Sequence, residues 1–236
     1  MGDMSFTEAK AELQFLLGNR TDADTTNSTR LKKWLNDGYF YMCHPSVHRF
    51  REMQAISNAT VLVSGTNEYS METLEPEEGN SAGTVVAIRW VSHIESTTYS
   101  ATANRRKLTP RSIRWLESRS NRSGRPLHYI MDGNSMFLYG VPSTSESGQI
   151  LRIGYYREPG FYGGTEGNTE LSTYYDRPLL KFAQAFAETD LGERAKSLVT
   201  LKEATGLLNN AVDKNELEAE DDGFRTEVIL HSAMGF

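Results

Sequence analysis

The sequence predicts an α+β fold. N- and C-terminal helices would pack as a bundle, with an inserted antiparallel β-rich domain and an extended C-terminal tail. Three observations favour this class. Apolar residues recur at helical spacing near the start of the chain, alternate at strand spacing through its middle, and return to helical spacing near its end. Such segregation of helices from strands is typical of α+β proteins.

Two helices are expected early in the first section, residues 1–55. Ser5 and Glu8 have the spacing of a capping box for the first helix, which should end at Gly18. After a polar loop, Ser28 or Thr29 should open the second helix. Its apolar stripe would comprise Leu31, Trp34, Leu35, Tyr39 and Met42.

Pro45 interrupts this helical pattern. A short third helix is predicted beyond it from the apolar residues Val47, Phe50 and Met53. Pro45 also separates His44 from His48 and Glu52, whose four-residue spacing would otherwise suit zinc on one helical face. No metal site is therefore predicted.

The second section, residues 56–160, should be the β-rich insertion. Alternating apolar residues predict strands over residues 59–64, 68–73, 85–94 and 149–156. A β-hairpin is predicted from two further apolar runs that flank Asp132-Gly133-Asn134-Ser135, because these residues suit a tight turn. Thr109 and Pro110 predict the start of a short helix, with an inner face formed by Ile113, Trp115 and Leu116.

The third section, residues 161–213, should contain a glycine-rich loop and a long helix that completes the bundle. Asp176 is the expected cap of this helix, and Pro178 lies in its first turn. Helical spacing continues for about 35 residues, with Gly192 and Gly206 as weak points. Residues 214–236 are acidic and then sparsely apolar, so an extended tail is predicted.

Composition argues against several classes of protein. The net charge is −6, and no apolar run approaches the roughly 20 residues of a membrane span, so no membrane partner is expected. The single cysteine, Cys43, allows no internal disulfide, which favours a reducing compartment. No nucleophile motif, phosphate-binding loop or metal-ligand cluster stands out. We therefore expect no enzyme, no catalytic residues and no cofactor.

Charge is segregated along the chain. Eight basic residues and one acidic residue lie between Arg105 and Arg125, whereas the rest of the chain carries 17 basic and 30 acidic residues. Asp213 to Asp222 holds six acidic residues and one lysine. Candidate contacts between subunits or with partners are Arg105, Arg106, Lys107, Arg111, Arg119, Arg122, Glu216, Glu218, Glu220, Asp221 and Asp222.

Three interpretations of this charge pattern are open. The two segments are solvated faces, they join copies of the chain head to tail in a ring, or the basic segment binds DNA. Trp115 and Tyr129 lie near the arginines and could stack on bases, although we expect Trp115 to fill the core.

The order of three motifs resembles the head-to-tail connector, or adaptor, proteins of tailed bacteriophages. Residues 31–39, LKKWLNDGY, are similar to the family's W-hydrophobic-N-x-(A/G)-Y helix. Gly124 to Tyr129, the turn at 132–134 and the segment 139–142 are like its G-x-P-x-x-Y hairpin that closes on proline. Residues 151–159, a loop and a long helix from near Pro178 complete the pattern. Since each motif is short, the resemblance rests on their order and spacing over residues 28–212.

The resemblance implies a non-catalytic structural subunit of the phage neck. It implies a ring, typically of twelve copies, that joins the portal protein to tail, tail-terminator or nozzle proteins. Genomic DNA would pass through the lumen without sequence-specific binding. The net acidity of the chain suits such a conduit, so we expect the arginine segment to point away from the lumen, towards a protein partner. The expected location is the virion, with host cytoplasm during assembly. The alternative is a nucleic-acid-binding module that uses the Arg105–Arg125 segment.

The C-terminal residues have an implied role of their own. Members of the family often use C-terminal segments to engage the portal, which corresponds here to residues 214–236. Candidate portal-contacting residues are Phe224, Val228, Ile229, Leu230, Met234 and Phe236.

Overall fold

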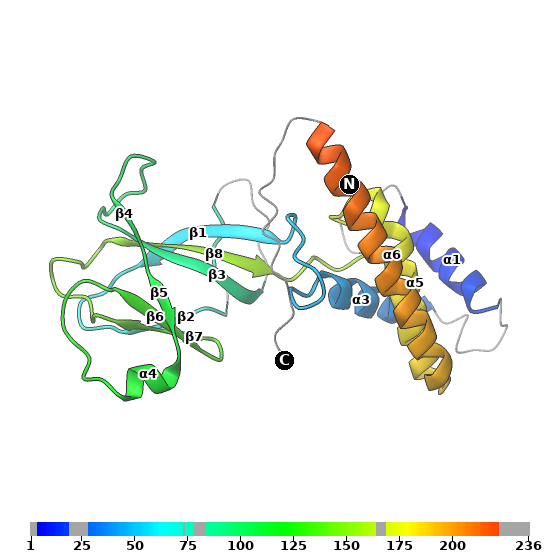
Figure 1. Cartoon of the computed structure of the whole chain (residues 1–236), viewed down its shortest axis with the longest axis horizontal. Coiled ribbons are helices and arrows are strands. Elements are labelled where there is room, and N and C mark those ends of the chain that lie inside the picture. The colour runs from blue at the N-terminus through cyan, green and yellow to red at the C-terminus, as the bar shows by residue number, and fades with distance from the viewer. Residues whose placement is uncertain (1–3, 19–27, 73, 78–83, 164–168, 222–236) are drawn as a thin grey trace. The chain divides into compact units, whose positions relative to one another are not determined.

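The computed structural model describes residues 4–18, 28–72, 74–77, 84–163 and 169–221, and it confirms the α+β class (Figure 1). The chain forms two compact units. Unit 1 comprises Met1–Met42 and Phe161–Phe236, and unit 2 comprises Cys43–Gly160. Unit 1 is helical and unit 2 is β-rich. Among the described residues, no helix has the length and apolar character needed to cross a membrane.

Unit 1 is built from the helices α1 (Phe6–Leu16), α3 (Ser28–Cys43), α5 (Asp176–Asp190) and α6 (Arg194–Asp221), with the 3₁₀ turn η1 (Thr173–Tyr175) before α5. The predicted capping box at the start of α1 is confirmed. The Ser5 side chain accepts from the Glu8 N–H, and the Glu8 carboxylate accepts from the Ser5 N–H at 2.8 Å. Because η1 leads directly into α5, Asp176 lies in the first turn of this helix and Tyr175 takes the cap position.

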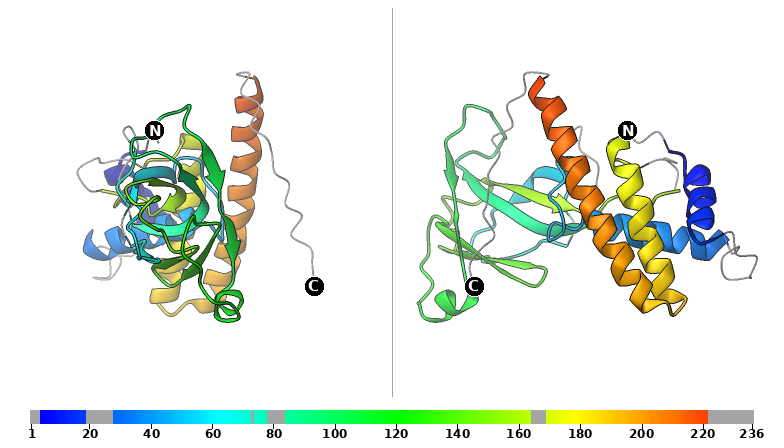
Figure 2. Two further views of the ribbon diagram at one scale, coloured as in Figure 1. Left: turned by 90° about the vertical axis from the view of Figure 1, so that its left-hand side faces the viewer. Right: turned by 45° about the vertical axis from the view of Figure 1, so that its right-hand side comes forward.

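The predicted long C-terminal helix is two helices, broken at Gly192, one of its two predicted weak points. The chain reverses between α5 and α6 at Gly192, whose φ of +85° favours glycine, and the two helices lie side by side (Figure 2). Gly206 stays inside α6. Periodicity could not reveal the reversal, since the apolar residues on both sides of Gly192 keep helical spacing.

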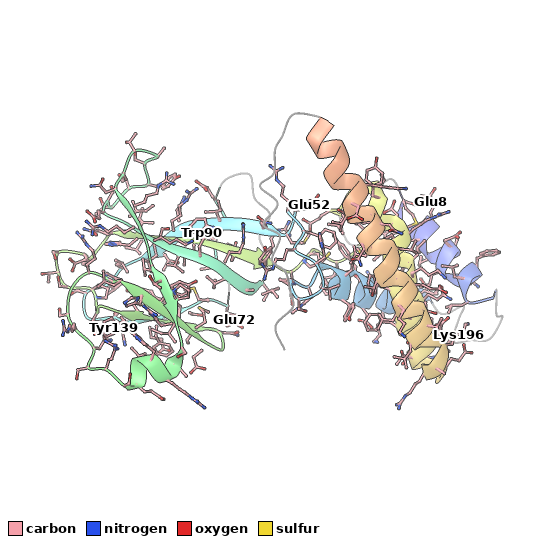
Figure 3. The ribbon with its side chains drawn as sticks, viewed as in Figure 1. Glu8, Glu52, Glu72, Trp90, Tyr139 and Lys196 are labelled. Atoms are coloured by element: carbon pink, nitrogen blue, oxygen red, sulfur yellow. The ribbon has the colours of Figure 1, made fainter. Side chains whose placement is uncertain are left out.

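A buried carboxylate joins the two helices of this hairpin. Glu188 of α5 has no exposed surface, and it accepts hydrogen bonds from Gln184 at 2.8 Å and from Thr200 of α6 at 2.7 Å. The ammonium of Lys196, which Figure 3 labels on α6, lies near the same carboxylate. The distance between the two groups is 3.1 Å. The hydrogen bond to Glu188 raises the pKa of Lys196. Hydrogen bonds of this kind offset the cost of burying the charge.

The predicted extended tail must be corrected at its start. Helix α6 continues to Asp221, so residues 214–221 are helical. Residues 222–236, including Asp222 and all six candidate portal-contacting residues, lie outside the described part of the chain.

Unit 2 contains two four-stranded sheets, visible as separate layers in Figure 1. The first has the order β1-β8-β3-β4, with all neighbours antiparallel, and consists of Gln54–Val61, Ile150–Arg157, Val85–Ile94 and Arg105–Lys107. The second has the order β2-β7-β6-β5 and consists of Glu68–Ser70, Ser135–Tyr139, His128–Asp132 and Thr109–Arg111. Only the β5–β6 pair is parallel among these.

The core of unit 2 draws on both sheets. Its buried residues include Val91 of β3, Tyr155 of β8, Tyr129 of β6 and Leu138 of β7. The predicted hairpin is confirmed as β6 and β7, in which Asp132 pairs with Ser135 and Gly133 has a φ of +55°. The hairpin therefore supplies one wall of this core.

One predicted helix, at the end of the first section, does not form, and another, in the β-rich region, begins later than predicted. Val47 to Met53 forms turns before β1, because Phe50 and Met53 are buried by tertiary contacts rather than along a helical stripe. Thr109 and Pro110 belong to strand β5, where the Thr109 N–H donates to the Leu127 carbonyl at 3.1 Å. A proline suits such an edge strand, since its missing donor would face solvent.

The short helix itself exists as α4, Ile113–Glu117. Its cap is Ser112, whose hydroxyl accepts from the Trp115 N–H. None of its residues is buried, so the predicted inner face is wrong.

Candidate interaction surfaces

The motif in α3 fixes this helix within unit 1. Trp34 is fully buried, and its indole N–H donates to the Asp190 carboxylate at 3.0 Å. The buried Asn36 amide pairs with the backbone of Tyr162 in both directions: its oxygen accepts from the N–H at 2.8 Å and its nitrogen donates to the carbonyl at 3.1 Å. These side chains hold the segment after β8 against α3.

The next two motif residues bring α3 close to its neighbours. A Cβ added to Gly38 would lie 2.6 Å from the Ala183 nitrogen of α5, so only glycine permits this approach of the helices. The Tyr39 hydroxyl accepts from the Glu170 N–H at 3.0 Å. The motif is therefore a set of packing contacts, and it contributes no reactive group to a site.

The other two motifs are structural in the same way. The Gly124 N–H donates to the Val141 carbonyl at 2.7 Å, and Tyr129 is buried in the core of unit 2. In β8 the Arg152 guanidinium pairs with the Glu77 carboxylate at 3.2 Å, and Arg157 donates to the Glu52 carbonyl at 3.1 Å. Each of these contacts anchors a strand or a strand end of unit 2.

The basic segment lies along two sheet edges of unit 2. Arg105, Arg106 and Lys107 form β4 at the edge of the first sheet, and Arg111 lies on β5 at the edge of the second. Arg119 and Arg122 follow α4. All six candidate basic residues are exposed, as the prediction of a contact surface requires.

Some of these charges are already paired within unit 2. The Glu95 carboxylate lies 2.8 Å from Arg106 and 3.1 Å from Arg125. Arg105 donates to the Ala101 carbonyl at 3.1 Å and lies over the Tyr99 ring. Sequence reasoning missed Glu95, because only the pairing of β3 with β4 brings it beside the arginines.

Trp115 organises a second group of basic residues, which we name the Trp115 cluster. It comprises Arg111, Trp115, Arg119, His128 and Tyr139. The guanidinium carbons of Arg111 and Arg119 lie 5.3 and 4.6 Å from the centre of the Trp115 ring. His128 and Tyr139 contact the same ring edge-on at 4.8 and 4.9 Å (Tyr139 in Figure 3).

This geometry corrects the expectation that Trp115 fills the core, since the side chain is only partly buried. Burial, with the positive charges of Arg111 and Arg119, lowers the pKa of His128, so the imidazole is neutral near pH 7. The indole is engaged by four side chains of its own unit, so it is not an open platform for base stacking.

The acidic candidates lie on unit 1. Glu216, Glu218, Glu220 and Asp221 belong to the last turns of α6, which also carry the exposed Asp213. The basic and acidic candidates are thus on different units of the chain.

A hollow of about 280 Å³ on unit 1 was not expected from the sequence. Its lining includes Lys33, Asp37, Phe40 and Phe161, with no histidine or cysteine. Lys33 and Asp37 pair at 2.8 Å, and Phe161 is 70% exposed and contacts Phe40 edge-on. The hollow therefore offers aromatic surface with a neutralised charge pair.

The earlier metal candidates do not form a site. His44 is hydrogen-bonded to Ser46 at 2.6 Å, and His48 packs edge-on against Phe50. Among the residues that the structure describes, no group of three or more His, Cys, Asp or Glu side chains could hold a metal ion.

The comparison with protein families agrees with the resemblance that the order of the three motifs indicates. No curated protein matches the chain. A family model described as SU10 adaptor protein, however, matches residues 4–225, which include all three motifs and most of both units. This match confirms the resemblance to phage head-to-tail adaptor proteins, and the chain belongs to the SU10 adaptor protein family.

Proposed function

We propose that this phage adaptor is a ring-forming subunit of the virion neck that joins the portal to the tail. The observation that carries the proposal is the family match over residues 4–225. The buried contacts of Trp34, Asn36 and Gly38 support it, because they give the matched α3 motif a purely structural role. Both favour a structural rather than a catalytic protein.

In this proposal the helices of unit 1 pack as a bundle that forms the ring wall. Support comes from large apolar side chains on the surface of this unit. Phe15, Leu198 and Val199 are 62%, 64% and 59% exposed, and Phe161 is more exposed still. Exposed apolar groups of this kind favour burial against neighbouring subunits. Obligate interfaces often exceed roughly 2,000 Å².

The lumen of the proposed ring conducts the genome without binding it. A net charge of −6 suits a conduit, because like charges keep phosphates from adhering. The arginine segment would then face protein partners, and arginines lining the lumen would contradict this arrangement. We do not adopt the DNA-binding alternative, because the Trp115 ring is already engaged by the chain's own side chains.

The test is a complementation assay with phage particles that lack this protein. Purified protein should restore the joining of heads to tails, and its mass by light scattering should rise above that of a monomer when portal-bearing heads are added. A variant with Asn36→Ala should join fewer particles, whereas Lys33→Ala should match the wild type. Heads that accept tails without the protein, or wild-type protein that never joins them, would overturn the proposal.

A further inference from the structure

We propose that the Trp115 cluster is the docking site for the acidic last turns of α6 from a second copy of this chain. The proposal rests on the proposed function only in requiring self-association. It names the surfaces through which copies meet, which neither the family match nor the fold specifies.

The first argument is the bonding state of the arginines. Arg106 and Arg125 share Glu95, and Arg105 is held by Ala101 and Tyr99. By contrast, no carboxylate among the described residues pairs with the exposed Arg111 or Arg119. The charges of Arg111 and Arg119 are therefore not neutralised in the way that Glu95 neutralises Arg106 and Arg125.

The second argument is the geometry of the cluster. A guanidinium group over an indole uses its face for the cation–π contact and keeps its N–H edge for hydrogen bonds. The guanidinium carbons of Arg111 and Arg119 both lie within 5.3 Å of the centre of the Trp115 ring, which His128 and Tyr139 contact edge-on. Two ordered guanidinium groups are suited to carboxylates, which they bind through paired hydrogen bonds.

The third argument identifies the occupant by charge. The segment from Asp213 to Asp222 contains six acidic residues and one lysine, and it is helical up to Asp221. Asp213, Glu216 and Glu220 are spaced by three and four residues, so they share one face of the helix. An acidic helical segment of one copy and the arginines of the Trp115 cluster of another would form a heterologous contact, which can close into a ring.

The experiment uses charge reversal in the full chain. One variant carries R111E and R119E, a second carries E216K and E220K, and a third combines all four changes. The control carries R49E and R51E, which change the net charge by the same amount at two exposed arginines of unit 2 outside the basic segment. Self-association is measured by sedimentation velocity at low and at physiological salt, and folding is checked by circular dichroism.

The first two variants should each associate at least about tenfold more weakly than the wild type, since like charges would face each other. The control should associate with a strength within about threefold of that of the wild type, because exposed charges away from the contact contribute little. Equimolar mixing of the first two variants should restore association between unlike molecules, and the combined variant should associate by itself. The milder pair R111Q and R119Q should weaken association if the reversed variant does not fold.

Several outcomes would overturn the proposal. Restoration in the combined variant but not in the mixture would place the contact within one chain. Binding of duplex DNA at physiological salt that is lost with R111Q and R119Q would assign the cluster to nucleic acid. Association that is unaffected by all of these changes would reject the docking site while leaving the ring proposal intact. A wild-type protein that stays monomeric would reject the docking site, whereas the ring proposal is judged by the joining of particles.

Discussion

Asn36 shows how a single side chain connects distant parts of the sequence. Its amide binds the backbone N–H and carbonyl of Tyr162, 126 residues away, and also donates to the Lys32 carbonyl at 2.9 Å. An amide supplies both a donor and an acceptor, so it can satisfy a complete peptide unit that is removed from water. Leucine at this position could bond neither the N–H nor the carbonyl of Tyr162. Aspartate could accept from the N–H only.

Replacing Asn36 by alanine should therefore destabilise unit 1. The change leaves the buried Tyr162 N–H and carbonyl without partners, which costs about 1–3 kcal/mol. Urea unfolding followed by tryptophan fluorescence would measure the difference. Lys33→Ala is the matched control on the same helix, because an exposed Lys–Asp pair contributes less than about 1 kcal/mol. Equal effects of the two changes would contradict the role given to Asn36.

At the scale of elements, the hairpin of α5 and α6 depends on where the chain turns. Gly192 and Gly206 interrupt the same run of helical spacing, yet only Gly192 takes a positive φ. The buried contacts of Glu188 with Thr200 and Lys196 exist only because the chain reverses between them. Local spacing could not separate the two glycines, since their difference arises from the packing of α6 on α5.

The two glycines should respond in opposite directions to alanine. Gly192→Ala forces a left-handed conformation on a residue with a Cβ, which costs about 1–2 kcal/mol. Gly206→Ala should stabilise the protein by about 0.5–1 kcal/mol, because Gly206 lies in a helix and an added Cβ meets no atom within 4 Å. Thermal unfolding of both variants would check the pair. A lower melting temperature for Gly206→Ala would contradict this description of α6.

At the scale of the whole molecule, three histidines in the described part of the chain have shifted pKa values, and they belong to unit 2. Burial is the main cause that lowers the pKa of His48, His93 and His128. The Nε2–H of the buried His93 donates a hydrogen bond to the Gln149 Oε1 at 2.7 Å. Each of these groups resists protonation in the folded state more than in the unfolded chain, where its pKa is about 6.5.

The sign of the pH dependence follows from linkage. Below about pH 6.5 the unfolded chain binds more protons than the folded one, so stability should fall as pH decreases from 7.5 to 5.5. The loss should concentrate in unit 2. Hydrogen exchange with mass spectrometry, corrected for the intrinsic rate, should therefore show a larger increase in exchange between pH 7.5 and pH 5.5 in β3 and β8 than in α5.

His93→Gln gives the control for this prediction. The variant removes one of the three titrating groups, so its stability should depend less on pH over this range than that of the wild type. An unchanged dependence of stability on pH in this variant would contradict the role given to the buried histidines. A larger increase in exchange in α5 than in β8 between pH 7.5 and pH 5.5 would contradict it as well.

The sequence by itself determined the features that depend on near neighbours in the chain. The capping box at Ser5 and Glu8 and the turn at Gly133 act over a few residues. The segregation of charge and the order of the family motifs are properties of the linear sequence, so all four could be recognised directly. The tertiary structure decided which arginines of the basic segment are neutralised within the chain and which remain available for contacts with other molecules. Glu95 neutralises Arg106 and Arg125, whereas Arg111 and Arg119 meet over Trp115. Glu95 reaches Arg106 because β3 pairs with β4, and the Trp115 ring is held by His128 and Tyr139 of the hairpin. No local pattern encodes these contacts between separate segments.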